Sequence, residues 1–194
     1  DAVAVDPEYS GEAWPGDFTY AERPLAGAEY TITAAEDIYT QDNQVDAGGN
    51  RTLWYAKGDV VAVVTTGNGT ADWAAFAPAR TDATYAFLSV IHDGTLGEVS
   101  VTLPLGSYHV EETKPPYGYV GTAQSYDVTF AWNDQTNEVV LAKTIVSHAE
   151  DGTDTAANFE ISNESSASAA DKEAQALAYH NEREKARVGV YKLD

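Results

Sequence analysis

A glutamate follows an alternating apolar run in the stretch "YHVEETKPPYGYV", residues 108–120. If this run is a strand, its side chains alternate between two faces, so Glu112 points the same way as Tyr108 and Val110, towards the core. Burial among aromatic rings generally raises the pKa of a carboxyl group, and a protonated acid can polarise a carbonyl and pass a proton to a leaving group. The sequence therefore singles out Glu112 as a candidate general acid or base.

The same glutamate has a plain structural alternative. A strand residue next to a turn is often half exposed, and Lys114 is near enough in the sequence to pair with it. The two interpretations differ in the direction of the Glu112 side chain, and therefore in the strands that position it.

Period-two alternation of apolar and polar residues runs along most of the chain and predicts those strands. The clearest inward face is made by Tyr126, Val128, Phe130 and Trp132. Strands are expected in residues 28–33, 59–66, 83–94, 98–112, 125–132, 138–146, 158–162 and 186–194. Many short strands separated by Gly, Asn and Asp turns predict an all-β sandwich or a small barrel.

Two segments depart from this pattern. Residues 1–16 are acidic and contain Pro and Gly, so we expect a leader or linker there. The stretch 166–186 is rich in Ala, Glu and Lys and follows Ser and Asn residues that could cap a helix. It predicts a short surface helical insertion at about 166–182.

The composition excludes several classes of function. Hydrophobic residues make up 43% of the 194 residues, enough for a real core, and the absence of cysteine excludes disulfides and thiolate metal sites. A formal charge of −20 argues against binding to nucleic acid or to anionic membrane surfaces. No run is long enough for a transmembrane helix, so we expect no membrane insertion by this part of the protein.

The metal-ligating residue types do not form a convincing site. The histidines His92, His109, His148 and His180 lack the spacing of a helical metal pair. The stretch "HAEDGTD", residues 148–154, faintly resembles a calcium loop, but a solvated acidic turn fits its spacing better. We therefore expect no metal and no cofactor.

Three ordered motifs carry a resemblance to a known family. They are "PLAGAEYTI" (24–32), "LPLGSYHVEETKPPYGYV" (103–120) and "NEREKARVGVYKLD" (181–194). In this order they resemble the Cna-B or SpaA-like domains of Gram-positive surface proteins and pilins. The resemblance implies a Cna-B-like (prealbumin-like, Ig-like) β-sandwich over residues 17–187. Residues 188–194 would be its last strand or the first strand of a following module.

The resemblance also implies a role. Domains of this kind act as stalk or spacer modules of extracellular, cell-wall-anchored adhesins and pilins. The expected partners are therefore the neighbouring modules of the same protein, and we expect no enzymatic activity. The alternative is a ligand- or carbohydrate-binding adhesin module that recognises a host or glycan ligand. In that case Trp14, Trp54 and Trp73 could supply faces on which a sugar stacks.

The family further implies a covalent cross-link. In many members an inward acid in the motif E-T-x-A-P-x-G-Y promotes an isopeptide bond between a lysine of the first strand and an asparagine of the last. "ETKPPYGY" fits this motif with Glu112 as the acid, although Pro115 stands where the family usually has alanine. The motif favours Asn181 as the asparagine, with Asn163 as the rival.

The lysine does not fit as well. The segment before and within "PLAGA", residues 16–28, has no lysine, and the first lysine of the sequence is Lys57. Lys192 fits the pattern, but its "VGVYKLD" run resembles the first strand of a following module. Our hypothesis is that this domain lacks its own Lys–Asn bond and that Lys192 serves the next module.

Overall fold

The computed structural model describes residues 2–9, 18–39, 46–70, 76–78, 89–91, 95–133, 140–161 and 175–183. The regular secondary structure within these ranges consists of β-strands and contains no helix, which confirms the prediction of an all-β fold. In the same ranges there is no helix of the length and apolar character that crossing a membrane requires.

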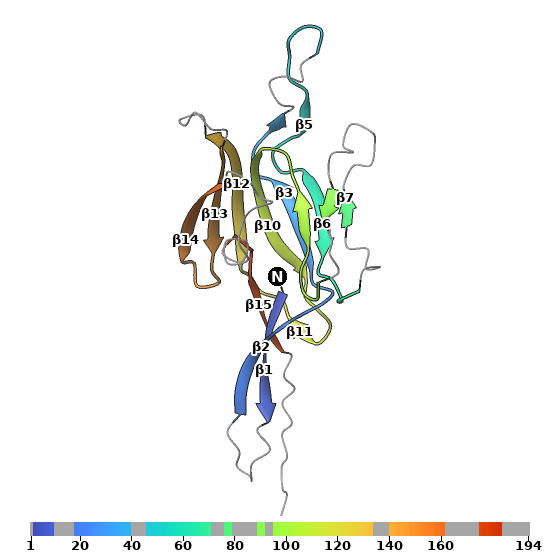
Figure 1. Ribbon diagram of the computed structural model, residues 1–194, viewed down its shortest axis with the longest axis vertical. Helices are drawn as coiled ribbons and strands as arrows, with labels where there is room; N and C mark the ends of the chain where they lie inside the picture. Colours follow the sequence, from blue (N-terminus) through green and yellow to red (C-terminus); the bar gives the residue numbers. More distant parts are fainter. Residues whose placement is uncertain are drawn as a thin grey trace, which may run out of the picture.

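A seven-stranded antiparallel sheet forms the larger layer (Figure 1). In spatial order its strands are β14 (Asp154–Ile161), β13 (Val140–His148), β12 (Ser125–Asn133), β10 (Gly106–Lys114), β3 (Glu29–Ala34), β6 (Val60–Thr65) and β7 (Phe76–Pro78). Valine, isoleucine, threonine and tyrosine recur in these strands, and such residues suit a pleated, half-buried surface.

A second sheet has four strands, in the order β11 (Tyr119–Val120), β15 (Tyr179–Arg183), β1 (Ala2–Tyr9) and β2 (Phe18–Pro24). It meets the larger layer through β15, and its β1–β2 hairpin extends beyond the body (Figure 1). The pair β1–β15 is parallel, whereas β1–β2 and β11–β15 are antiparallel. Two small hairpins complete the described strands: β4 (Ile38–Tyr39) with β5 (Leu53–Tyr55), and β8 (Ser89–Ile91) with β9 (Ser100–Thr102).

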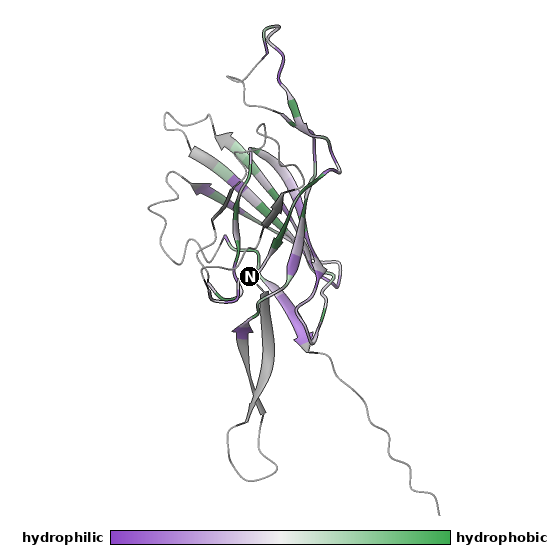
Figure 2. Ribbon diagram, turned by 90° about the vertical axis from the view of Figure 1, so that its right-hand side faces the viewer, coloured by the Kyte–Doolittle hydropathy of each residue, from purple (hydrophilic) through white to green (hydrophobic). Residues whose placement is uncertain are grey.

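The hydrophobic core lies on the inner face of the large sheet. Its buried side chains include Tyr30, Ile32, Val61, Val64, Tyr108, Val110, Tyr126, Val128, Ile145 and, from the second sheet, Tyr179. In β3 the burial alternates strictly along the strand, as a sheet with one covered face requires. Figure 2 shows green, hydrophobic segments along the strands of this central body.

Residues 2–9, for which the sequence suggested a leader or linker, form the strand β1. This strand is hydrogen-bonded on both sides, to β15 and to β2. Its "AVAV" alternation is a strand signal that the neighbouring Pro and Gly residues obscure. The N-terminal part of the chain therefore belongs to the smaller sheet.

The expected helix is wrong wherever the structure describes its range. Residues 175–178 form a turn and a bend, and the residues that follow form β15. Tyr179 and Asn181 are buried while His180 and Glu182 are exposed, which is the period of a strand. Packing of these two inward side chains outweighs the helix propensity of the alanines and glutamates before and after them. The earlier part of that prediction, 166–174, lies outside the described residues.

Candidate functional site

Glu112 lies on the inner face of β10. Tyr108 and Val110 of the same face are 0% and 7% exposed, and Glu112 is half-buried at the end of this row. A β-bulge at Thr113 follows immediately, since Glu112 pairs with Tyr30 of β3 whereas the next register pair begins at Lys114. Bulges are typical of places where a strand redirects a side chain, and here the bulge ends the regular pairing beside the carboxylate.

Asn181 of β15 meets this carboxylate from the other sheet. Its amide Nδ2 donates to both carboxylate oxygens of Glu112, at 2.9 and 2.8 Å, and to the Val120 carbonyl at 3.2 Å. The backbone N–H of Thr122 adds a fourth contact, at 3.0 Å from Glu112 Oε2. We refer to this joint between the two sheets as the Glu112–Asn181 clasp.

The amide of Asn181 is only partly satisfied. The residue is 2% exposed, and its Oδ1 is buried without a hydrogen-bond partner among the described residues. A buried acceptor left unpaired costs about 1–3 kcal/mol, so native proteins retain few of them. The clasp thus combines a well-held nitrogen with an uncompensated carbonyl oxygen.

Three tyrosines surround the clasp. The Tyr179 ring lies 4.5 Å from that of Tyr30 and 5.0 Å from that of Tyr126, and its hydroxyl donates to the Val110 carbonyl at 2.7 Å. Burial raises the pKa of Tyr30 and of Tyr179 far above the usual range for tyrosine, and the negative charge of Glu112 adds to the shift of both. Both hydroxyls therefore stay protonated at any physiological pH.

The loop 121–124 closes over the Glu112 carboxylate, and the turn between β13 and β14 holds this loop in place. Glu150 of that turn accepts hydrogen bonds from Thr122 Oγ1 at 2.7 Å and from the Ala123 N–H at 2.9 Å. These bonds hold the pKa of Glu150 below its usual value. Asp151 accepts from the Thr153 N–H inside the same turn. Glu150 and Asp151 thus hold the turn and the loop 121–124, whereas Asp154 begins β14.

The position beside Asn181 on the neighbouring strand is Ala4. In the parallel pair β1–β15 these two residues are in register, and β1 contains no lysine. The described lysines have other partners or face solvent: Lys114 Nζ lies 2.6 Å from Glu29 Oε1, Lys143 Nζ donates to the Gln175 carbonyl, and Lys57 is exposed. Among the described residues, no ammonium group contacts the clasp.

The structure places the remaining candidates differently. Asn163, Lys192, Trp14 and Trp73 lie outside the described residues. Trp54 is 8% exposed and belongs to the core, so it offers no open face for a sugar. Within the described ranges no group of three or more His, Asp or Glu side chains could hold a metal ion.

Sequence reasoning missed two members of the site. Thr122 and Tyr179 contact Glu112 and Val110 respectively, yet neither belongs to the quoted motifs. Tyr179 had a signal, namely its shared parity with Asn181 two residues later. Thr122 binds through its backbone N–H, for which no side-chain pattern exists.

Comparison with known proteins gives one match. The family model of the SpaA prealbumin-like fold domain matches residues 19–145, well over half of the chain. No curated protein matches, and no solved structure matches. The matched range contains Glu112 but ends before Asn181, so the clasp itself rests on the geometry above.

Proposed function

Because the chain belongs to the family of SpaA prealbumin-like fold domains, we propose that it is a non-enzymatic stalk or spacer module of an extracellular, cell-wall-anchored Gram-positive surface protein. Domains of this family occur in surface proteins of Gram-positive bacteria. Such a module holds other parts of its protein at a distance from the cell wall, and its partners are the adjoining modules.

The observation that carries this proposal is the pairing of β1 with β15. These two strands are parallel, with Ala2, Val3 and Ala4 in register with Tyr179, His180 and Asn181. Tension between the two ends of the domain pulls neighbouring parallel strands in opposite directions along their length. Their contacts then resist shear together instead of opening one after another. Asn181 belongs to this pair and ties it to the large sheet through Glu112 of β10.

Replacing Asn181 with alanine should therefore lower the force at which the domain unfolds. The substitution removes the bonds to both oxygens of Glu112 and to Val120, and leaves a half-buried carboxylate without its main donor. Single-molecule pulling from the two ends measures this force. Asn158→Ala is the matched control, since it removes the same side chain from an exposed position on β14. Equal unfolding forces for Asn181→Ala and the native sequence would show that the clasp does not contribute to mechanical resistance.

We further propose that no Lys–Asn isopeptide bond forms at Asn181 within this domain. Support comes from β1, which has alanine in register with Asn181 and no lysine, and from the absence of lysine before Lys57. Glu112 and Asn181 then act as a hydrogen-bonded joint where related domains use an amide bond. Lys192, in the same proposal, supplies the lysine of a following module.

Intact-mass spectrometry tests this directly. We expect the purified chain to have the mass of its sequence, and the Glu112→Ala variant to differ from it by the substitution alone. A chain lighter by one ammonia, with the deficit lost in Glu112→Ala, would show that an internal Lys–Asn bond forms after all. Peptide mapping of the cross-linked product would then distinguish Lys192 from the other lysines.

A further inference from the structure

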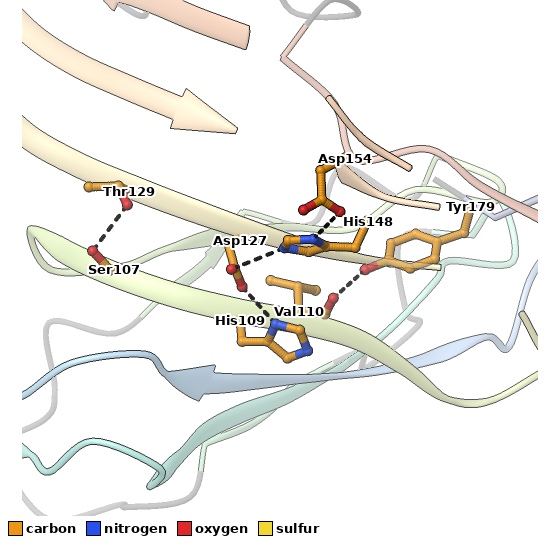
Figure 3. Close-up of polar contacts among 8 residues, drawn as sticks. All are labelled: Ser107, His109, Val110, Asp127, Thr129, His148, Asp154 and Tyr179. Carbon is orange, nitrogen blue, oxygen red and sulfur yellow. Dashed lines mark hydrogen bonds and ion pairs between the residues drawn. The ribbon is translucent and has the colours of Figure 1, made fainter. Parts of the chain in front are cut away.

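Two histidines and two aspartates form a continuous row on the outer face of the large sheet, away from the clasp (Figure 3). His109 Nδ1 lies 2.7 Å from Asp127 Oδ1, the second oxygen of Asp127 lies 3.1 Å from His148 Nε2, and His148 Nδ1 lies 2.8 Å from Asp154 Oδ1. The four residues come from four successive strands, β10, β12, β13 and β14. We call this row the histidine–aspartate ladder.

The ladder requires a charged imidazole at His148. Both of its ring nitrogens face carboxylate oxygens, and an ionised carboxylate can only accept hydrogen bonds. A neutral imidazole carries one N–H, so one of the two contacts would then place a lone pair against a carboxylate. His109 has no such requirement, because its single contact in the ladder is satisfied by one N–H.

The electrostatic surroundings favour the charged form. The ionisable groups on the same face or in the adjoining turn are His109, Glu111 and Lys114 of β10, Glu29 of β3, Asp127 of β12, Asp154 and Glu160 of β14, and Glu150 and Asp151 of the β13–β14 turn. Apart from His109 and Lys114, which is paired with Glu29, these are all acids. Hydrogen bonds to Asp154 and Asp127 raise the pKa of His148 above its usual 6.5. For Asp127, burial raises the pKa, but hydrogen bonds from His109 and His148 outweigh it and leave the pKa below 3.8.

The strand at the end of the ladder is weakly held by packing. Among the described strands β14 pairs only with β13, and its side chains from Asp154 to Asn158 are exposed. Phe159 is half-buried against the core, and Asn158 bonds Thr144 of β13. Regions with few buried contacts open at low free energy, so polar contacts such as Asp154–His148 add to the backbone pairing that holds β14 to β13.

We propose that the histidine–aspartate ladder is a pH-responsive latch that fastens the edge strand β14 to the sheet in mildly acidic surroundings and loosens it above neutral pH. The charged His148 bridges β12 and β14 through its two N–H groups. Loss of one proton removes one of these bridges and leaves the other carboxylate facing an imidazole lone pair.

The direction follows from proton linkage. A histidine whose pKa is raised on folding contributes its full stabilisation below 6.5, and this contribution is lost as the pH rises through the raised value. The Asp127 contribution is present above 3.8 and is lost as the pH falls through its lowered pKa. The latch is therefore closed between these limits and opens on the alkaline side by deprotonation of His148.

Amide hydrogen exchange across pH 5 to 9, expressed as protection relative to the unfolded chain, tests the latch. We expect the protection of the β14 amides, and not that of the other strands, to fall as the pH rises through the pKa of His148. The fall should be about tenfold for each unit by which the pKa of His148 is higher with β14 attached than with β14 detached. Protection of β3 and β10 should not show this step. A titration of the His148 ring by NMR in the unmodified protein should give a midpoint above 6.5.

Two variants complete the test. His148→Gln should remove the pH step in β14, whereas His180→Gln, which removes an exposed histidine of β15, should keep it. A His148 midpoint at or below 6.5 in the unmodified protein would overturn the proposal. A pH step in β14 that persists in His148→Gln, or a step that also occurs in β3, would overturn it as well. The His148 midpoint is measured in the unmodified protein, so that test remains decisive even if a variant fails to fold.

Discussion

Replacing Tyr179 with alanine is expected to lower the free energy of unfolding by about 3–5 kcal/mol, the range for removing a large buried aromatic side chain. Tyr179 is 2% exposed and is the core residue that β15 contributes. Its ring packs on Tyr30 and Tyr126, and its hydroxyl bonds the Val110 carbonyl. The substitution leaves a cavity between the two sheets and removes the hydroxyl contact to Val110. Urea denaturation followed by tryptophan fluorescence measures the change.

Tyr179→Phe separates the two contributions, because it keeps the ring and removes only the hydroxyl. We expect it to cost about 1 kcal/mol, the net value of one hydrogen bond. Tyr117→Ala serves as the control, since the Tyr117 side chain is fully exposed, and it should change stability by less than about 0.5 kcal/mol. A Tyr179→Ala loss no greater than that of Tyr117→Ala would mean that β15 does not close the core.

The alternation of the sequence was sufficient to orient Glu112. Tyr108, Val110 and Glu112 share one face, and the structure places the first two in the core and the third at its margin. The strict period of two makes such an assignment robust, because a shift by one residue would expose every apolar side chain of the strand. The bulge at Thr113 lies after this row, so it does not disturb the assignment.

Other features depend on contacts that no local pattern encodes. The strand β1 is stabilised by pairing with β15 and β2, and β15 is separated from it by most of the chain. Residues 179–182 have helix-forming neighbours, and they form a strand because Tyr179 and Asn181 fit under β10 and because β1 and β11 pair with them. The histidine–aspartate ladder was missed for the same reason, since its members lie up to 45 residues apart in the sequence and meet only through sheet register.

Ala4→Lys is expected to convert the clasp into a covalent bond. Residue 4 is in register with Asn181 on the adjacent parallel strand, and such strands lie about 4.8 Å apart, within reach of a lysine side chain. The amine Nζ would attack Cγ of Asn181, Glu112 would accept a proton from Nζ and deliver it to the departing nitrogen, and ammonia would leave. The product is an amide between residues 4 and 181, lighter than the sequence by one ammonia.

The bond would close a loop of well over a hundred residues, for which the chain-entropy estimate for cross-links gives roughly 5 kcal/mol of stabilisation. Intact mass and the urea midpoint should therefore change together in Ala4→Lys. The double variant Ala4→Lys/Glu112→Ala retains the amine but lacks the proton carrier, so it should keep the full mass and gain no such stability. A folded Ala4→Lys protein of unchanged mass would show that Glu112 and Asn181 hold the sheets together without being arranged for amide exchange. Because this test supplies the amine at the registered position, its result depends on the geometry of the clasp and not on the origin of the lysine.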